Sequence, residues 1–188
     1  MILALSNSKG GVGKTTIAVH LAVWMAEQGH DVAFVDADVQ GSSSGWLGES
    51  APEMKTNRLL TPDDIVDQLP GLAAEHKYVI ADGPAGLTEV TRAILWLADL
   101  AIFPCGPSAL DLRAVIEAMT VVHQIQQIRK GLPAEIFIPN KLQPNYRLSR
   151  ELVQTVKKLG MPAGDGLRLR QAYADAAGQG TVVWRMAT

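Results

Sequence analysis

The octet from Lys9 to Thr16 reads Lys-Gly-Gly-Val-Gly-Lys-Thr-Thr and constrains the fold more than any other part of the chain. It follows an apolar run, Ile2 to Leu5, and precedes an apolar pattern of helical period. A buried strand, a glycine-rich turn and a helix in this order form the context of a phosphate-binding loop, or P-loop. Glycines let the backbone wrap closely around an anion, and the amides at the helix N-terminus face it. The octet therefore predicts a nucleotide-phosphate site at the first strand–helix junction.

The residues of this loop have distinct predicted roles. Lys14 is expected to reach the β- and γ-phosphates, Thr15 to hold Mg²⁺ through its hydroxyl, and Thr16 to donate to the α-phosphate. The remaining nucleotide contacts are expected from the backbone of Gly10, Gly11, Val12 and Gly13. Ser8 stands where the common pattern has glycine, and a second lysine, Lys9, precedes the glycine pair. Because Lys14 already serves the phosphates, we predict that Lys9 reaches a nucleotide held by a second copy of the chain, in an ATP sandwich dimer.

The bulk composition is that of one ordinary globular domain. A chain of 188 residues is long enough to bury a sizeable core, and its 19% of charged residues is typical of such domains. No apolar stretch is long enough to span a bilayer, and no basic segment precedes the first apolar run as in a signal peptide. The single cysteine, Cys105, cannot form an internal disulfide. These features predict one domain over residues 1–188 and a cytoplasmic protein.

Apolar runs alternate with helical patterns along the whole chain, which predicts an α/β fold with a mostly parallel sheet and helices on both faces. We expect a short sixth strand near Gly166–Leu169, a helix from Ser149 to Leu159, and a loop in the serine-rich stretch Gly41–Gly45. The five stronger strand candidates are Ile2–Asn7, Val32–Asp36, Tyr78–Asp82, Leu100–Pro104 and Ile136–Pro139.

Three aspartates stand where predicted strands end, and ligands of open α/β sheets bind beyond the carboxyl ends of the strands. Asp82 follows the third strong candidate and is expected to accept from Mg²⁺-bound water, as a Walker B acid does. Asp38 is expected to orient the attacking water, and Asp36 to organise the Mg²⁺ shell or the loop. Turn chemistry or helix capping is the alternative for a single strand-end aspartate. Asn140, after the fifth candidate, can bond adenine through its amide or cap a turn.

Charge is distributed unevenly along the chain. Residues 141–188 contain eight Lys or Arg against three Asp or Glu, a net charge of +5, whereas the first 140 residues carry −7. Such asymmetry indicates either a surface for a polyanion or a solvated helix face.

In combination these motifs resemble those of the ParA/MinD ATPases. The octet at Lys9 is similar to their deviant Walker A motif, the segment Asp-Ala-Asp-Val-Gln-Gly-Ser from Asp36 to their first switch, and Asp-Gly-Pro-Ala-Gly from Asp82 to their second. Weaker similarity covers Pro104 to Asp111 and the segment from Arg170, so the resemblance extends over almost the whole chain. Within the family the chain most resembles the compact ParA proteins, which lack an N-terminal specific DNA-binding domain.

The resemblance implies a Mg²⁺-dependent ATPase that dimerises around ATP, with Lys9 contacting the partner's nucleotide. It also implies non-specific DNA binding, a ParB-like or cargo-adaptor protein that stimulates hydrolysis, and a cargo such as a plasmid, a chromosome region or a large protein assembly. The protein would then associate with the nucleoid in its ATP state, and no membrane binding is expected. The candidate DNA-binding residues are Arg147, Arg150, Lys157, Lys158, Arg168 and Arg170.

The sequence departs from the family pattern in two places, and three alternative functions are open. Val39 replaces the proline that is usual in the first switch, and relatives usually continue into another helix after the position of Trp184. A MinD-like protein would instead bind membrane through a C-terminal amphipathic helix. A nitrogenase-like reductase would need more cysteine ligands than Cys105 provides. An ATP-dependent metabolic enzyme would need a substrate pocket, for which the sequence offers no distinctive acid–base pair.

Overall fold

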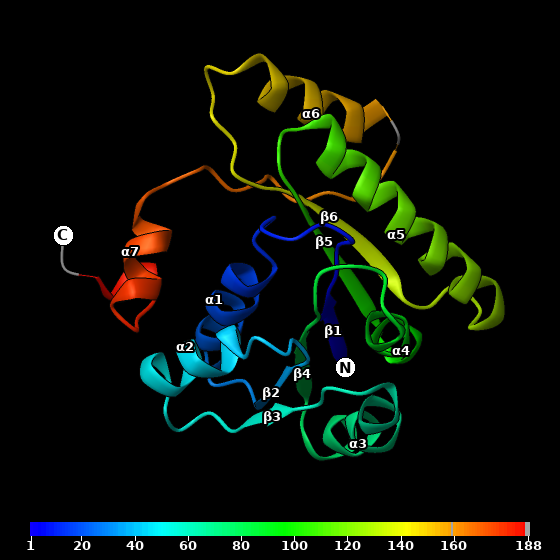
Figure 1. Ribbon diagram of the computed structural model, residues 1–188, viewed down its shortest axis with the longest axis vertical. Helices are drawn as coiled ribbons and strands as arrows, with labels where there is room; N and C mark the ends of the chain where they lie inside the picture. The colour runs from blue at the N-terminus through cyan, green and yellow to red at the C-terminus, as the bar shows by residue number, and fades with distance from the viewer. Residues whose placement is uncertain (159, 187–188) are drawn as a thin grey trace.

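A computed structural model describes residues 1–158 and 160–186 of the chain. Its centre is a sheet of six strands, all parallel, in the order β3-β2-β4-β1-β5-β6 (Figure 1). The first strand is therefore central, and the P-loop that follows it emerges in the middle of the sheet's carboxyl edge. The strands are β1 (Ile2–Leu5), β2 (Val32–Asp36), β3 (Thr56–Arg58), β4 (Tyr78–Asp82), β5 (Leu100–Cys105) and β6 (Ala134–Pro139).

Helices connect successive strands and cover both faces of the sheet, as parallel crossovers require. One face carries α3, α4, α5 and α6, and the other carries α1 and α2 (Figure 1). The helices are α1 (Lys14–Glu27), α2 (Ser42–Ser50), α3 (Pro62–Glu75), α4 (Glu89–Leu97), α5 (Ala109–Ile128), α6 (Arg147–Lys158) and α7 (Ala172–Gly178), followed by the 3-10 turn η1 (Val183–Arg185).

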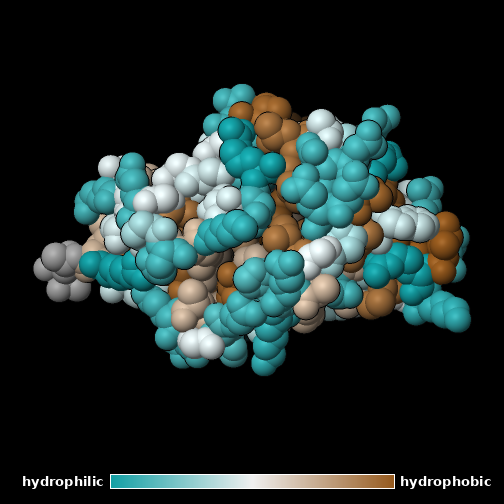
Figure 2. Space-filling model, turned by 90° about the horizontal axis from the view of Figure 1, so that it is seen from below, coloured by the Kyte–Doolittle hydropathy of each residue, from teal (hydrophilic) through white to brown (hydrophobic). Residues whose placement is uncertain are grey.

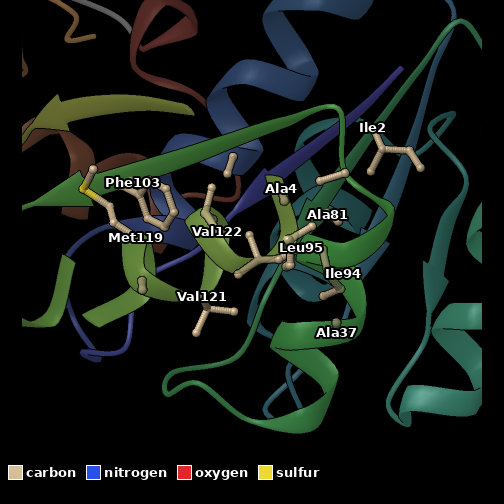
Figure 3. Close-up of a cluster of buried hydrophobic side chains, with 14 of the residues drawn as sticks. Ile2, Ala4, Ala37, Ala81, Ile94, Leu95, Phe103, Met119, Val121 and Val122 are labelled. Carbon is tan, nitrogen blue, oxygen red and sulfur yellow. The ribbon is translucent and has the colours of Figure 1, made fainter. Parts of the chain in front are cut away.

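Alternation along the central strand divides the core between the two faces. Ile2 and Ala4 pack under α4 and α5, whereas Leu3 and Leu5 pack under α1, because successive strand side chains point to opposite faces. Figure 3 shows Ala4 beside Leu95 of α4 and side chains of α5. Figure 2 looks onto the end of the molecule that carries β3 and α3, where a mostly hydrophilic surface surrounds hydrophobic patches. Because β2, β4 and β1 are neighbours in the sheet, their carboxyl ends lie beside one another.

The predicted fold class is confirmed, and the bounds of β2 and β4 are those expected from the sequence. Both strands are buried on both faces, so their apolar runs are continuous and their ends are sharp. The predicted helix Ser149–Leu159 begins two residues earlier, at Arg147, and its expected last residue lies outside the described residues.

Two predictions of local structure are wrong. The stretch Gly41–Gly45 begins helix α2 rather than forming a loop, because the buried carboxylate of Asp36 accepts from the backbone N–H of Ser44 and replaces a local cap. The sixth strand is β3, at the far edge of the sheet, and not the segment near Gly166–Leu169. In that segment only Arg168 forms an isolated bridge, with Leu142.

Candidate nucleotide and metal site

The P-loop connects the end of β1 to the start of α1. Gly13 is the N-cap of α1 at φ 99°, and Gly11 has φ 73°, a left-handed conformation that side chains other than glycine rarely adopt. Within the described chain no side chain caps α1, so the first-turn amides are available to an anion. The loop borders a hollow lined by Gly10, Gly11, Gly13, Lys14, Thr15, Thr16, Asp38, Ala85 and Lys141. Every predicted phosphate-contacting residue except Val12, which is buried, thus lines one hollow.

Lys14 is buried and lines this hollow, and its ammonium donates to the carbonyl of Lys9 at 3.3 Å. Burial lowers the pKa of Lys14, and the nearby carboxylates of Asp82 and Asp38 oppose that shift. A partly desolvated cation that has a single hydrogen-bond acceptor among the described residues is suited to bind a phosphate oxygen.

Asp82, at the end of β4, lies beside Thr15. The Thr15 hydroxyl donates to one carboxylate oxygen, Oδ2, at 2.8 Å. The other oxygen, Oδ1, is buried without a hydrogen-bond partner among the described residues. Burial raises the pKa of Asp82 to about 6, and the Asp36 charge adds to this rise, while the hydroxyls of Thr15 and Ser43 and the charge of Lys14 oppose it.

A hydroxyl and an unsatisfied buried carboxylate oxygen, beside a phosphate hollow, fit Mg²⁺. This cation usually keeps several waters and combines one or two protein ligands with the phosphates of a nucleotide. The described residues contain no group of three or more His, Cys, Asp or Glu side chains that could bind a metal by themselves. The site is therefore of the kind that nucleotide and protein complete together.

Asp36 and Asp38 differ sharply in their surroundings. Asp36 is fully buried at the end of β2: its Oδ2 accepts from the N–H and hydroxyl of Ser44 at 2.9 and 2.6 Å, and its Oδ1 accepts from the N–H of Asp38 at 3.1 Å. Both oxygens therefore hold protein backbone. Asp38 is half-buried and lines the phosphate hollow. Of the two roles predicted for Asp36, organising the loop matches these contacts.

Lys9 does not line the hollow of its own chain and pairs instead with an acid of α5. Its ammonium lies 2.5 Å from Oδ1 of Asp111 in the first turn of α5, and its side chain is 41% exposed. Its backbone N–H donates to Asn7, whose buried amide in turn donates to the carbonyl of Pro104. Lys9 is thus fixed at its backbone by a hydrogen bond and at its ammonium by an ion pair. Sequence reasoning placed Asp111 in a family motif but did not predict this pairing.

Asn140 and Lys141 follow β6 and contact the P-loop. The amide of Asn140 donates to the carbonyl of Val12 at 2.7 Å, and the Lys141 ammonium donates to that of Gly11 at 2.6 Å. Lys141 has φ 55° and was missed by the sequence analysis as a site residue. The base contact of Asn140 stays a prediction.

A second hollow adjoins the first and is lined by Gly13, Thr16, Ile17, Asn140, Lys141, Leu167, Arg168, Leu169, Arg170 and Tyr173.

The six predicted DNA-binding residues are exposed and lie on α6 and on the segment that precedes α7. Arg150 and Arg168 line one hollow together with Asp165, and Arg168 and Arg170 line a neighbouring one. Lys157 and Lys158 lie at the opposite end of α6, which stands at the top of Figure 1. The structure therefore places Arg150 and Arg170 each beside a hollow that Arg168 also lines, and the two lysines at the other end of the helix.

The fold and this site define a P-loop nucleotide-binding protein. Residues 3–183 match the model of the CobQ/CobB/MinD/ParA nucleotide binding domain, and the chain belongs to that family. As a member with a complete deviant Walker A loop, the chain is a ParA/MinD-type ATPase whose cofactors are ATP and Mg²⁺.

Several known proteins are similar over most of the chain. Maintenance of carboxysome distribution protein A from Halothiobacillus neapolitanus is 28% identical over 98% of this chain and 87% of its own length. Chromosome partitioning protein ParA from Caulobacter vibrioides is 40% identical over 84% and 74%. The structure of apo McdA from Cyanothece superimposes with a TM-score of 0.83 at 18% identity, covering 97% of this chain and 91% of that one.

The described residues form no helix with the length and apolar character needed to cross a membrane.

Proposed function

We propose that this ATPase is a switch that dimerises on binding ATP, holds DNA non-specifically in that state, and positions or partitions a cargo. The observation that carries the proposal is Lys9, a P-loop lysine that does not line the phosphate hollow of its own chain and whose side chain remains partly exposed. A lysine placed this way is available to a nucleotide in a second copy of the chain. The names of two relatives, which refer to carboxysome distribution and chromosome partitioning, support a positioning role.

In the proposed reaction the protein mainly positions groups and neutralises charge. Lys14 and the loop amides hold the phosphates, while Thr15 and Asp82 would hold Mg²⁺, which would neutralise the charge that develops on the transferred phosphate. Asp38 orients the attacking water, and Asp36 fixes the backbone from which Asp38 projects. Lys9 of the second copy places its positive charge beside the transferred phosphate.

The ion pair between Lys9 and Asp111 must open before Lys9 can reach a second copy. We therefore expect Asp111→Asn to lower the ATP concentration that gives half-maximal dimerisation by about 1.4-fold to fivefold, because one pair opens for each ATP bound and each partly exposed pair is worth about 0.2–1 kcal/mol. Light scattering during an ATP titration measures this shift. Lys9→Ala should abolish ATP-dependent dimerisation in the same assay.

Glu117→Gln is a matched control, because Glu117 is another acid of α5 near the start of the P-loop, 3.4 Å from the Ser8 hydroxyl. It should leave the ATP titration unchanged. Dimerisation of Lys9→Ala at the wild-type ATP concentration would rule out the proposed role of Lys9 in a second subunit.

DNA is the proposed partner, because the positive side chains on α6 and before α7 are exposed to solvent and form a surface that could bind it. Only Arg147 among them pairs with an acid in the described structure, with Glu151 at 3.4 Å in an exposed helical pair. Lysines and arginines that neutralise phosphates give sequence-independent affinity that falls steeply with salt. Dimerisation would double this surface and so link DNA affinity to ATP.

The proposed cycle ends when a ParB-like or cargo-adaptor protein stimulates hydrolysis and releases the dimer from DNA. The ATP form would then reside on the nucleoid of the cytoplasm, and the ADP form would diffuse. The cargo class follows from the relatives: a large protein assembly, as the carboxysome name suggests, or a chromosome or plasmid region.

A further inference from the structure

The turn that presents Asp38 to the phosphate hollow is held by a residue of another strand. We define the Asp38 loop as residues 37–41, between β2 and α2. Arg58, the last residue of β3, donates from one guanidinium nitrogen to the carbonyls of Asp38 at 3.2 Å and Val39 at 3.1 Å. Asp36 holds the same loop from the inside, through the N–H of Asp38. The loop is therefore fixed from the core and from the sheet edge.

The Asp38 loop is a tight turn whose second position is Val39. The N–H of Gly41 donates to the carbonyl of Asp38 at 3.0 Å, and the N–H of Gln40 donates to the Asp38 carboxylate at 3.0 Å. Proline is favoured at the second position of such turns because its ring fixes φ. Val39 is 70% exposed, so its side chain contributes little packing to the turn. The turn consequently lacks the rigidity that the more usual proline supplies.

Gly41 allows Arg58 to reach this turn. Its φ is 66°, and a Cβ at this position would lie 3.3 Å from the guanidinium carbon of Arg58. Any side chain here would be strained by the left-handed conformation and would press on the guanidinium. The glycine, the turn and the arginine are thus fitted to one another.

We propose that Arg58 is a positioning residue for ATP hydrolysis, which fixes the Asp38 loop and supplies the rigidity that a proline at position 39 would give. This inference rests on the proposed role of Asp38 in orienting water. Arg58 holds the backbone carbonyl of Asp38 and, in the described chain, makes no bond to its carboxylate, and Asp38 lines the hollow. Its loss should therefore affect the rate of hydrolysis more than the binding of ATP.

The test compares Arg58→Met, Val39→Pro and the double variant with wild type. Methionine retains much of the aliphatic stem but cannot donate to the two carbonyls. We expect Arg58→Met to lower kcat about tenfold, with KM for ATP within about twofold, because only the transition state requires an ordered water. Within the described chain the N–H of Val39 makes no hydrogen bond, so proline at 39 removes none. Val39→Pro alone should behave as wild type, and in the Arg58→Met background it should restore kcat to within about twofold.

Lys55→Met is the matched control, because Lys55 is an exposed cation just before β3 and forms no hydrogen bond with the Asp38 loop in the described part of the chain. It should leave kcat unchanged. Wild-type turnover of Arg58→Met, a loss that Val39→Pro does not relieve, or a loss caused by Val39→Pro alone would each overturn the inference. Asp38→Ala, measured alongside, separates the two hypotheses. Normal turnover of Asp38→Ala means that the proposed role of Asp38 fails, whereas a blocked Asp38→Ala with an unaffected Arg58→Met rejects only the role of Arg58.

Discussion

Asp38→Ala is expected to lower ATP turnover by about 100-fold or more while ATP binding remains. The Asp38 carboxylate is the half-buried acid of the first switch that lines the phosphate hollow, whereas both oxygens of Asp36 bind backbone or hydroxyl groups. Removing it should leave the phosphate contacts of Lys14 and the loop amides intact. The ATP-bound dimer should therefore accumulate, which phosphate release and light scattering measure on the same sample.

Asp67→Ala is the matched control for this variant, because Asp67 is an exposed acid of α3 far from the P-loop in sequence. It should hydrolyse ATP at the wild-type rate. Turnover of Asp38→Ala within a few-fold of wild type would show that another group orients the water. Loss of ATP binding would show instead that Asp38 shapes the phosphate hollow itself.

Asp82→Asn is expected to stabilise the nucleotide-free protein at pH 8 while abolishing Mg²⁺-dependent turnover. The pKa of Asp82 is raised to about 6 in the folded chain, against an ordinary value of 3.8. Above pH 6 the folded state therefore contains a buried carboxylate that the unfolded chain would hydrate, and the full penalty is present there. This penalty falls as the pH drops from about 6 to about 4, because the folded state then takes up the proton first.

Asparagine removes the buried charge and can still accept from the Thr15 hydroxyl. The free energy of unfolding should rise by roughly 1–3 kcal/mol at pH 8, or several degrees in Tm, and the difference should vanish near pH 4. Thermal melts across this pH range measure it. Asp31→Asn is the control, and it should change the free energy of unfolding at pH 8 in the opposite direction. A hydrogen bond from His76 lowers the pKa of the exposed Asp31, so its charged form is favoured in the folded state. An Asp82→Asn protein that melts lower than wild type at pH 8 would contradict a costly buried charge.

The parts of the fold that were predictable are those set by local sequence. Continuous apolar runs mark β2 and β4 because both strands are buried on both faces. Helix α2 and strand β3 were missed for the opposite reason. The cap of α2 comes from Asp36, outside the helix, and β3 is a polar edge strand of three residues, Thr56–Arg58. Neither has a local pattern that distinguishes it from a loop.

The same division applies to the site. The P-loop is one contiguous motif, so its residues were found together, and Asp82 was found because it ends an apolar strand. The bond from Lys141 to the carbonyl of Gly11 joins positions 130 residues apart, and no spacing in the sequence indicates it. The contacts of Lys9 with Asp111 and of Arg58 with the Asp38 loop likewise depend on which strands are neighbours in the sheet.

The central claim, that ATP converts this chain into a DNA-binding dimer, is tested most directly by its affinity for a non-specific DNA duplex. Binding would be measured with ATP, with ADP and without nucleotide, at two salt concentrations, for wild type and for the charge-reversed pair Lys157→Glu and Lys158→Glu. The pair Lys55→Glu and Lys77→Glu, which adds the same charge on segments away from α6, is the control. The account predicts binding with ATP alone, weakened by salt, reduced by reversal on α6 and unaffected by the control. Equal binding in all three nucleotide states, or none in any, would contradict it.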